Sequence, residues 1–211
     1  MYATRQKSQN LALFDFDGTL CLKDSFTQFI FYALPKRRII KGGCRSLPWI
    51  AAYYAGIYPA HKMRPRLFKA MFAHFPKQKL DQLAQHYSQH LFRQLNPELL
   101  LQLRRHQQQG DQIVLVSASV DVYLKPLCQA LNIELLCSTT VSTHENYTGQ
   151  YLSADCSGEQ KRQRILSQYQ PQNYRKIYAY GNSHEDLAML ALADYPFMVG
   201  QQIRLPKVAS E

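Results

Sequence analysis

The stretch Leu11–Leu20 constrains the fold of this chain more than any other part of it. A short apolar run, Leu11–Phe14, is followed by two aspartates, Asp15 and Asp17, and by a Gly-Thr turn. The run is typical of a strand buried on both faces, and ligands of open parallel sheets bind beyond the carboxyl ends of such strands. Alternation points both carboxylates the same way, and this like-charge pair favours a divalent cation. The alternative is an acidic turn, since Asp and Gly are common turn residues.

The rest of the pattern predicts an α/β fold with a doubly wound parallel sheet, because predicted strands alternate with predicted helices. The further strands are predicted at Ile113–Val116, Ile133–Leu136, Ile177–Tyr180 and Phe197–Val199. Helices are predicted at Glu98–Gln109, Asp121–Leu131, Gln160–Gln168 and from Asp186 to Ala193, and a hairpin at Thr139–Leu152. A chain of 211 residues suits one core domain with a modest insertion.

The insertion is predicted to be helical and to follow the first strand directly. Apolar residues recur there at three- and four-residue intervals, and no strand pattern interrupts them. The predicted helices are Phe26–Ala33, Leu47–Tyr58, Arg66–Phe75 and Leu80–Leu95. We therefore assign residues 23–95 to the insertion and residues 1–22 and 96–211 to the core domain.

Charge is unevenly distributed along the chain. The net charge is +10, yet residues 25–80 hold 11 of the 25 Lys and Arg residues and none of the 15 acidic ones, so the remainder is nearly neutral. Three explanations fit such a segment: a solvated face, a field that attracts an anionic substrate, or contact with an anionic surface. Trp49, Tyr53, Tyr54 and Tyr58 are of the types found at membrane interfaces, or else they form the core of the insertion. We predict weak contact with an anionic membrane and no nucleic-acid partner.

Cysteine usage and hydropathy indicate the compartment. The five cysteines form no Cys-x-x-Cys pair, which favours reduced thiols over a disulfide framework or a zinc site. No apolar run is long enough to predict a membrane-spanning helix, and the polar stretch Met1–Asn10 shows no secretory signal. A cytoplasmic location is expected, with the membrane contact at most peripheral.

Three later polar stretches also stand out, and two of them lie at or just after the end of a predicted strand. Ser117 ends the second predicted strand, Lys161 closes the stretch Gly158–Lys161, and Gly181–Asp186 follows the fourth strand. Each also has a structural explanation. A hydroxyl after a strand caps the next helix, a lysine among charged residues belongs to a solvated face, and Ser183-x-x-Asp186 is a helix capping box.

Taken in order, these stretches resemble the four motifs of the haloacid dehalogenase-like (HAD) phosphatase superfamily. They are Asp-x-Asp-Gly-Thr-Leu at Asp15–Leu20, Ser117, Gly-x-x-Lys at Gly158–Lys161, and Gly181–Asp186. The layout is most similar to subfamily IB, which includes phosphoserine phosphatase. The resemblance implies a Rossmann-like core and makes residues 23–95 a helical cap over the catalytic mouth.

The resemblance also implies a role for each motif. Asp15 is the nucleophile that becomes an aspartyl-phosphate, and Asp17 is the general acid and later the base. Asp17 must therefore start protonated, which a neighbouring carboxylate would favour by raising its pKa. Ser117 donates to the phosphoryl group, and Lys161 neutralises the charge that accumulates there. The implied ligands of Mg²⁺ are Asp15, Asp17 through its carbonyl, Asn182 and Asp186; Asn182 departs from the commonest pattern, because an amide brings no charge.

The predicted function is a magnesium-dependent phosphomonoester hydrolase that acts on a small or lipid phosphomonoester. In phosphoserine phosphatases a cap glutamate nine residues after the nucleophile and a cap arginine contact the substrate; Asp24 has that spacing from Asp15 here. The predicted substrate contacts are Asp24, Arg64, Arg66 and Ser119. The alternative is a membrane- or nucleic-acid-binding protein on the same scaffold with weak or no catalysis, which the basic segment and Asn182 would favour.

Overall fold

The computed structural model of the chain describes residues 9–208 and is built on a five-stranded parallel sheet with the strand order β4-β3-β1-β7-β8. The strands are β1 (Leu11–Phe14), β3 (Gln112–Val120), β4 (Glu134–Ser138), β7 (Ile177–Gly181) and β8 (Tyr195–Met198). This order confirms the predicted doubly wound α/β fold. The prediction about the polar amino-terminal stretch concerns residues 1–8, which lie outside the described range.

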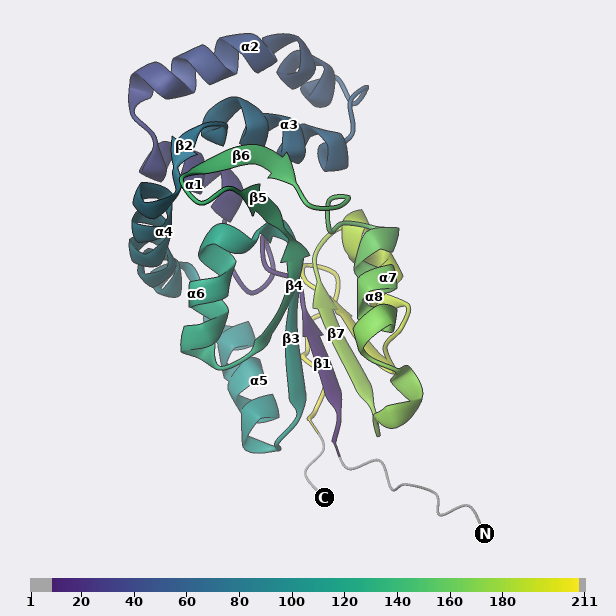
Figure 1. The fold of residues 1–211 in the computed structure, drawn as a ribbon. Helices are drawn as coiled ribbons and strands as arrows, with labels where there is room; N and C mark the ends of the chain where they lie inside the picture. Colours follow the sequence, from purple (N-terminus) through teal and green to yellow (C-terminus); the bar gives the residue numbers. More distant parts are fainter. Residues whose placement is uncertain (1–8, 209–211) are drawn as a thin grey trace.

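Helices cover both faces of this sheet (Figure 1), because side chains alternate along each strand. Ala12 and Phe14 of β1 belong to a buried cluster with α5 and α6, whereas Leu11 and Leu13 belong to a second cluster with α7 and α8. These helices are α5 (Pro97–Gln108), α6 (Asp121–Leu131), α7 (Glu159–Gln168) and α8 (Leu187–Leu190). The apolar run of β1 is therefore buried on both sides, as its composition predicts.

The segment after β1 forms four helices beyond the carboxyl edge of the sheet (Figure 1). They are α1 (Ser25–Ala33), α2 (Lys36–Tyr54), α3 (Ala60–Phe72) and α4 (Lys77–Leu91). The hairpin of β5 (Thr140–Ser142) and β6 (Asn146–Tyr151) confirms the predicted hairpin and packs on α3. The division into a core and a cap at residues 23–95 stays a prediction.

One strand interrupts the helical segment, contrary to the sequence-based expectation. Phe75–Pro76 forms the two-residue strand β2, which pairs antiparallel with β6. The neighbouring His74 N–H also donates to the Tyr147 carbonyl at 2.8 Å. So short a strand has no periodicity of its own, because it exists only through a partner more than 60 residues away in sequence.

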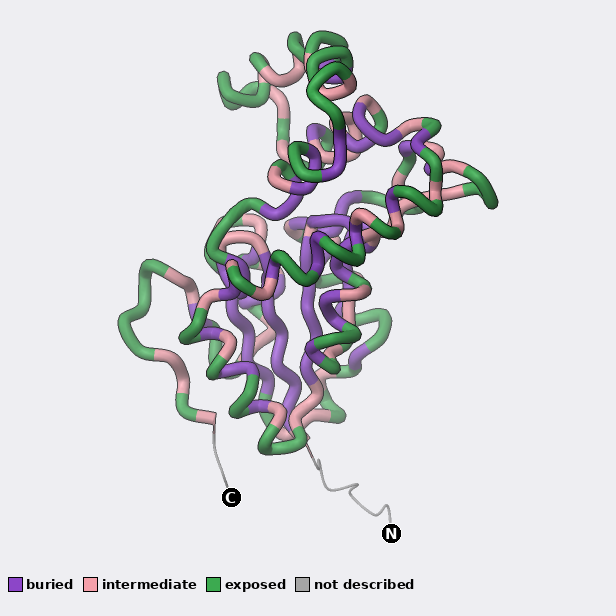
Figure 2. The backbone as a smooth tube through the Cα atoms, turned by 90° about the vertical axis from the view of Figure 1, so that its left-hand side faces the viewer, coloured by how far each residue is buried: buried purple, intermediate pink, exposed green. Residues whose placement is uncertain are grey.

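Several predicted helices have different bounds in the structure; the one predicted at Arg66–Phe75, for example, is α3. The helix predicted at Leu47–Tyr58 is part of α2, which starts at Lys36, passes through Pro48 and ends at Tyr54. Only Gly42 and Ser46 of α2 are buried, and Figure 2 shows how exposed this part of the chain is. The helix predicted to reach Ala193 is only a short 3₁₀ turn, His184–Asp186, followed by α8.

The remaining short elements are two 3₁₀ turns, Phe92–Gln94 and Pro171–Asn173. Across residues 9–208, no helix combines the length and the hydropathy needed to cross a bilayer.

Candidate active site

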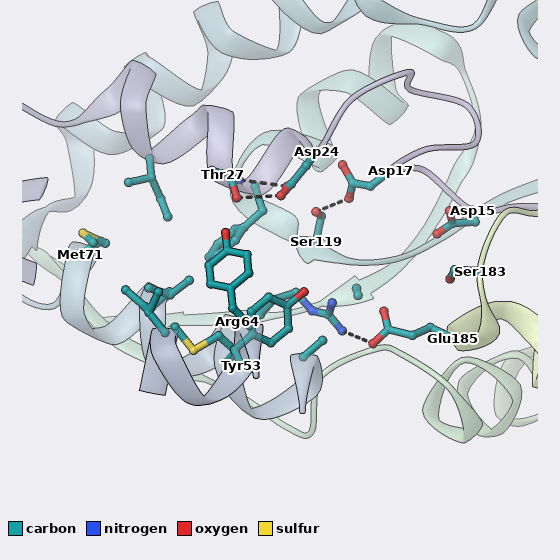
Figure 3. A pocket seen from close by; sticks show the side chains of 18 of the residues that line it. Asp15, Asp17, Asp24, Thr27, Tyr53, Arg64, Met71, Ser119, Ser183 and Glu185 are labelled. Carbon is teal, nitrogen blue, oxygen red and sulfur yellow. Dashed lines mark hydrogen bonds and ion pairs between the residues drawn. The ribbon is translucent and has the colours of Figure 1, made fainter. Parts of the chain in front are cut away.

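A cavity of about 500 Å³ lies beyond the carboxyl edge of the sheet, and all four polar stretches singled out in the sequence lie in or beside it. Most of its polar side chains come from the loops after β1 and β7, from the end of β3 and from the start of α7, and Arg64 comes from α3. Its other walls come from α1, α2 and α3. Figure 3 shows Asp15, Ser183 and Glu185 toward one end and Met71 toward the other.

Lys161 joins two carboxylates at the polar end. Its Nζ donates to Asp15 Oδ1 and to Asp186 Oδ1, each at 2.6 Å, and all three side chains are buried. Burial lowers the pKa of Lys161, but the two carboxylates outweigh burial, and the net shift is upward. Lys161 therefore stays charged, and the solvated-face explanation of this residue is wrong.

Asp15 and Asp186 differ in how well their negative charge is stabilised. Burial raises the pKa of Asp15 to about 6; Lys161 offsets part of this rise and Asp186 adds to it. Burial also acts to raise the pKa of Asp186, but Lys161 and the N–H groups of Asn182 and Ser183 hold it below its usual range. Asp15 is thus the less stabilised carboxylate of the pair, which suits a group that must react.

Asp17 lines the same cavity but has separate partners. Its Oδ1 accepts from the Ser25 N–H at 2.6 Å, and its Oδ2 accepts from the Ser119 hydroxyl at 2.5 Å. Burial raises the pKa of Asp17, while these hydrogen bonds oppose the rise and Asp24 adds to it. The direction agrees with the sequence-based expectation, but burial rather than a neighbouring carboxylate is the main cause.

The turn after Asp17 and the loop after β7 meet closely. Gly18 has a φ of +77°, and a Cβ placed there would lie 2.0 Å from Asn182 Nδ2. Glycine suits this left-handed backbone, and any other side chain here would also have to displace the Asn182 amide. In the loop itself, Ser183 and Asp186 form the predicted capping box. The other carboxylate oxygen of Asp186 accepts a hydrogen bond from Lys161. The capping box is therefore confirmed, whereas the role of Asp186 as a metal ligand stays a prediction.

The donors around this end are chemically suited to Mg²⁺. Carboxylate, carbonyl and amide oxygens are available from Asp15, Asp17, Asn182 and Asp186, and Lys161 already shows that two of these carboxylates can share one cation. No group of three His, Cys, Asp or Glu side chains suited to a metal occurs within residues 9–208. Mg²⁺ needs no such group, because one or two carboxylates with water and substrate phosphate are its usual ligands.

The two serines at the end of β3 differ from each other. Ser117 is buried, its Oγ accepts from the Ser119 N–H at 3.0 Å, and the cavity is lined by Ala118 and Ser119 but not by Ser117. The role of Ser117 as a phosphoryl donor stays a prediction. Ser119 lines the cavity and donates its hydroxyl hydrogen to Asp17. Its predicted contact with the substrate stays a prediction.

The predicted substrate-binding arginines lie in different places. Arg64 lines the cavity, where it donates to both oxygens of Asp155 at 2.9 Å and to Glu185 at 3.0 Å. Arg66 does not line this cavity; its guanidinium lies 3.8 Å from the centre of the Trp49 ring. No local pattern pointed to Asp155 or Glu185, which are 91 and 121 positions from Arg64 in sequence.

Asp24 lines the cavity and also has a structural role. Its carboxylate accepts from the N–H and the hydroxyl of Thr27, so it caps the start of α1. Both hydrogen bonds are exposed, which leaves the carboxylate accessible from the cavity.

The wall opposite the carboxylates is apolar, which the sequence did not predict. The side chains of this wall come from the first three helices and are Phe26, Ile30, Phe31, Ile39, Ile50, Tyr53, Tyr54, Met63, Leu67 and Met71. The alternative in which these aromatic side chains form the core of the insertion is therefore wrong for Tyr53 and Tyr54, which are exposed and line this cavity.

Comparison with known proteins gives a family model and a relative that each match most of this chain. A family model described as haloacid dehalogenase-like hydrolase matches residues 12–191. A histidinol-phosphatase of Neisseria meningitidis serogroup C (strain 8013) is 25% identical over 96% of each chain.

Solved structures share the fold at low identity. A protein of unknown function from Bordetella pertussis Tohama I has a TM-score of 0.71 at 22% identity, covering 88% of this chain and 87% of that one. A probable phosphoserine phosphatase from Vibrio cholerae has a TM-score of 0.65 at 18% identity, covering 89% of this chain and 56% of that one.

Proposed function

This chain belongs to the haloacid dehalogenase-like hydrolases, and on that premise we propose that it hydrolyses phosphate monoesters through an aspartyl-phosphate on Asp15. The observation that carries the proposal is the position of Lys161, 2.6 Å from both Asp15 and Asp186 at the polar end of the cavity. A buried cation between two carboxylates prepares the site for further negative charge, such as that of a phosphoryl group. The phosphatase activity of the Neisseria relative supports the same reaction.

The reaction follows from the partners of each carboxylate. The Asp15 carboxylate attacks phosphorus, the bond from phosphorus to the leaving oxygen breaks, and Asp17 gives its proton to that oxygen. Water then attacks the phosphorus of the aspartyl-phosphate, loses a proton to the Asp17 carboxylate and releases phosphate. The raised pKa of Asp17 favours the protonated form that the first step needs. Lys161 stabilises the charge on Asp15 and on the phosphoryl oxygens.

Mg²⁺ fits the donors at this end, and bound there it would neutralise charge on the transferred phosphoryl group. The residues that would hold it are Asp15, Asp17 through its carbonyl, Asn182 and Asp186. Asn182 adds no charge, so the affinity for Mg²⁺ depends mainly on the two carboxylates.

The substrate class follows from the charges in the cavity. Its lining has two cations, Arg64 and Lys161, and each is already paired with two carboxylates. A substrate carboxylate would find no free cation there and would lie near Asp24 and Glu185. We therefore propose a phosphomonoester that lacks a carboxylate and whose body is apolar or carries an amine. Histidinol phosphate, the substrate named for the Neisseria relative, is of this class.

The test is hydrolysis of p-nitrophenyl phosphate with acid trapping of the phosphoenzyme. We expect EDTA to abolish turnover and MgCl₂ to restore it, and the trapped phosphate to map to Asp15. Asp15→Asn should remove the trapped species and nearly all turnover while the protein stays folded, which its circular-dichroism spectrum checks. A phosphopeptide that maps to another residue would contradict the assignment.

The general acid is tested by changing the leaving group. Asp17→Asn should reduce hydrolysis of an alkyl phosphate far more than that of p-nitrophenyl phosphate, because a phenolate leaves without a proton. Equal losses for the two substrates would assign the proton to another group.

A further inference from the structure

A second cleft lies between α2 and α3, and no residue lines both this cleft and the catalytic cavity. Its volume is about 610 Å³. Its lining residues are Arg38, Lys41, Gly42, Arg45, Ser46, Trp49, Arg66, Lys69, Ala70, Ala73 and His74. The helices touch at Gly42, where a Cβ would lie 2.7 Å from the Met71 sulfur, so the cleft is a groove along a close helix–helix contact.

The lining of this cleft is strongly basic and lacks any acidic residue. Five lysines and arginines and one histidine line it, and the surrounding segment, residues 25–80, contains no Asp or Glu. Within residues 9–208, none of these five cations forms an ion pair with a carboxylate. No carboxylate in this lining therefore offsets the repulsion between the positive charges.

Contacts within the insertion fix the positions of two of the five cations. Arg38 donates to the Met71 and Ala73 carbonyls, each at 2.7 Å, and so ties α2 to the end of α3. Arg66 lies over the Trp49 ring and donates to the Tyr58 hydroxyl at 3.2 Å. These contacts fix the geometry of the groove and place two guanidinium groups along it.

The other three cations have no structural task. Lys41, Arg45 and Lys69 are exposed, and no hydrogen bond involves their side chains within the described residues. Lysines and arginines spread over a convex surface would be screened separately by salt. Here they converge on a concave groove, where one multivalent anion can contact several of them at once.

We propose that this groove binds a small anion with several phosphate groups, at a site separate from the catalytic cavity. The concave shape favours a free molecule over a bilayer, because a flat surface cannot enter a groove between two helices. Arg45 and the remaining N–H groups of Arg66 suit bidentate contacts with phosphate, while Lys41 and Lys69 supply point charges. The ligand also joins α2 to α3 and so stabilises a helix of which little is buried.

The test uses Trp49, the single tryptophan of the chain, which lines the groove. Titration with sodium tripolyphosphate should give a saturable change in Trp49 fluorescence that weakens as salt is added. The double variant Lys41→Gln, Lys69→Gln should weaken the apparent affinity by about tenfold, as expected for the loss of two close charge contacts. The fluorescence change reports binding and needs no catalysis, so this test is independent of the phosphatase proposal.

A matched control removes the same charge from the same basic segment. The double variant Lys36→Gln, Lys79→Gln changes two exposed lysines that line neither cavity, and it should keep the affinity within about twofold. Equal weakening by both double variants would overturn the proposal in favour of a diffuse field. A stronger Trp49 response to phosphatidylglycerol vesicles than to tripolyphosphate would overturn it in favour of a membrane surface.

Discussion

At the scale of single residues, Lys161 is the side chain on which the polar end of the cavity depends. It is 1% exposed, and its ammonium is the shared partner of two buried carboxylates that follow β1 and β7. A buried ion pair of this kind contributes little net stability as a whole, but the loss of one partner leaves charges without compensation.

Lys161→Met should therefore destabilise the fold by about 3–5 kcal/mol at pH 8. Without the ammonium, burial raises the pKa of Asp15 and Asp186 above their unfolded values, so both carboxyls stabilise the fold only while protonated. That contribution is present at low pH and is lost as the pH rises. The loss in the free energy of unfolding, relative to the unchanged protein, should therefore be smaller at pH 5 than at pH 8. Urea unfolding at the two pH values measures this.

Lys125→Met is the matched control for that variant, because the exposed Lys125 ammonium pairs with Asp121, a carboxylate that keeps its hydrogen bonds from Thr140. It should cost less than about 1 kcal/mol at either pH. A Lys161→Met deficit that is equally small, or one that grows toward pH 5, would contradict the shared ion-pair role.

At the scale of elements, α2 is the least buried of the long helices, and it lies between the two cavities. Its residues Ile39 and Ile50 line the catalytic cavity, whereas Arg45 and Trp49 line the basic groove. Cys44 lies on this helix and is the one exposed cysteine within residues 9–208.

A thiol reagent should therefore label Cys44 alone in the folded protein at pH 8. The other four thiols are buried, and burial raises the pKa of each of them, to about 11 for Cys21 and about 12 for Cys128. Few thiolates form from them, and the reagent cannot reach them. Ellman's reagent should count one fast thiol, and Cys44→Ser should remove it. Fast labelling of a second thiol without denaturant would contradict the packing of the core.

At the scale of the whole molecule, the cavity combines a charged end made by the sheet edge with an apolar wall made by α1–α3. Neither part of the chain encloses a substrate alone. The lining carries five carboxylates against two cations that are already paired.

The selectivity for substrates should follow from this excess of carboxylates over cations in the cavity. We expect kcat/KM for histidinol phosphate and for a medium-chain alkyl phosphate to exceed that for phosphoserine by about tenfold or more, because burying one unpaired substrate carboxylate costs well over 1 kcal/mol. Phosphate release from the three substrates under the same conditions measures this. Glu185→Gln removes one carboxylate that accepts from Arg64. It should reduce the difference in kcat/KM between histidinol phosphate and phosphoserine. Phosphoserine as the best of the three would contradict the proposed substrate class.

The sequence by itself determined the fold class and the polar ends of its strands. The apolar run of β1 predicts burial on both faces because its four residues carry that information locally, and strand–helix alternation leaves few other topologies. The order of the four motifs likewise placed Asp15, Lys161 and Asp186 at one edge of one sheet.

Only the tertiary structure decided which partner each side chain has. Asp15 and Lys161 are 146 positions apart, and Ser119 meets Asp17 across 102 positions, distances over which no local periodicity carries information. The same holds for β2, which exists through β6, and for α2, which continues through Pro48 along α3. Hydrogen bonds and ion pairs between remote segments depend on how the layers pack, so the charge balance of the cavity and the basic groove appear only in the folded chain.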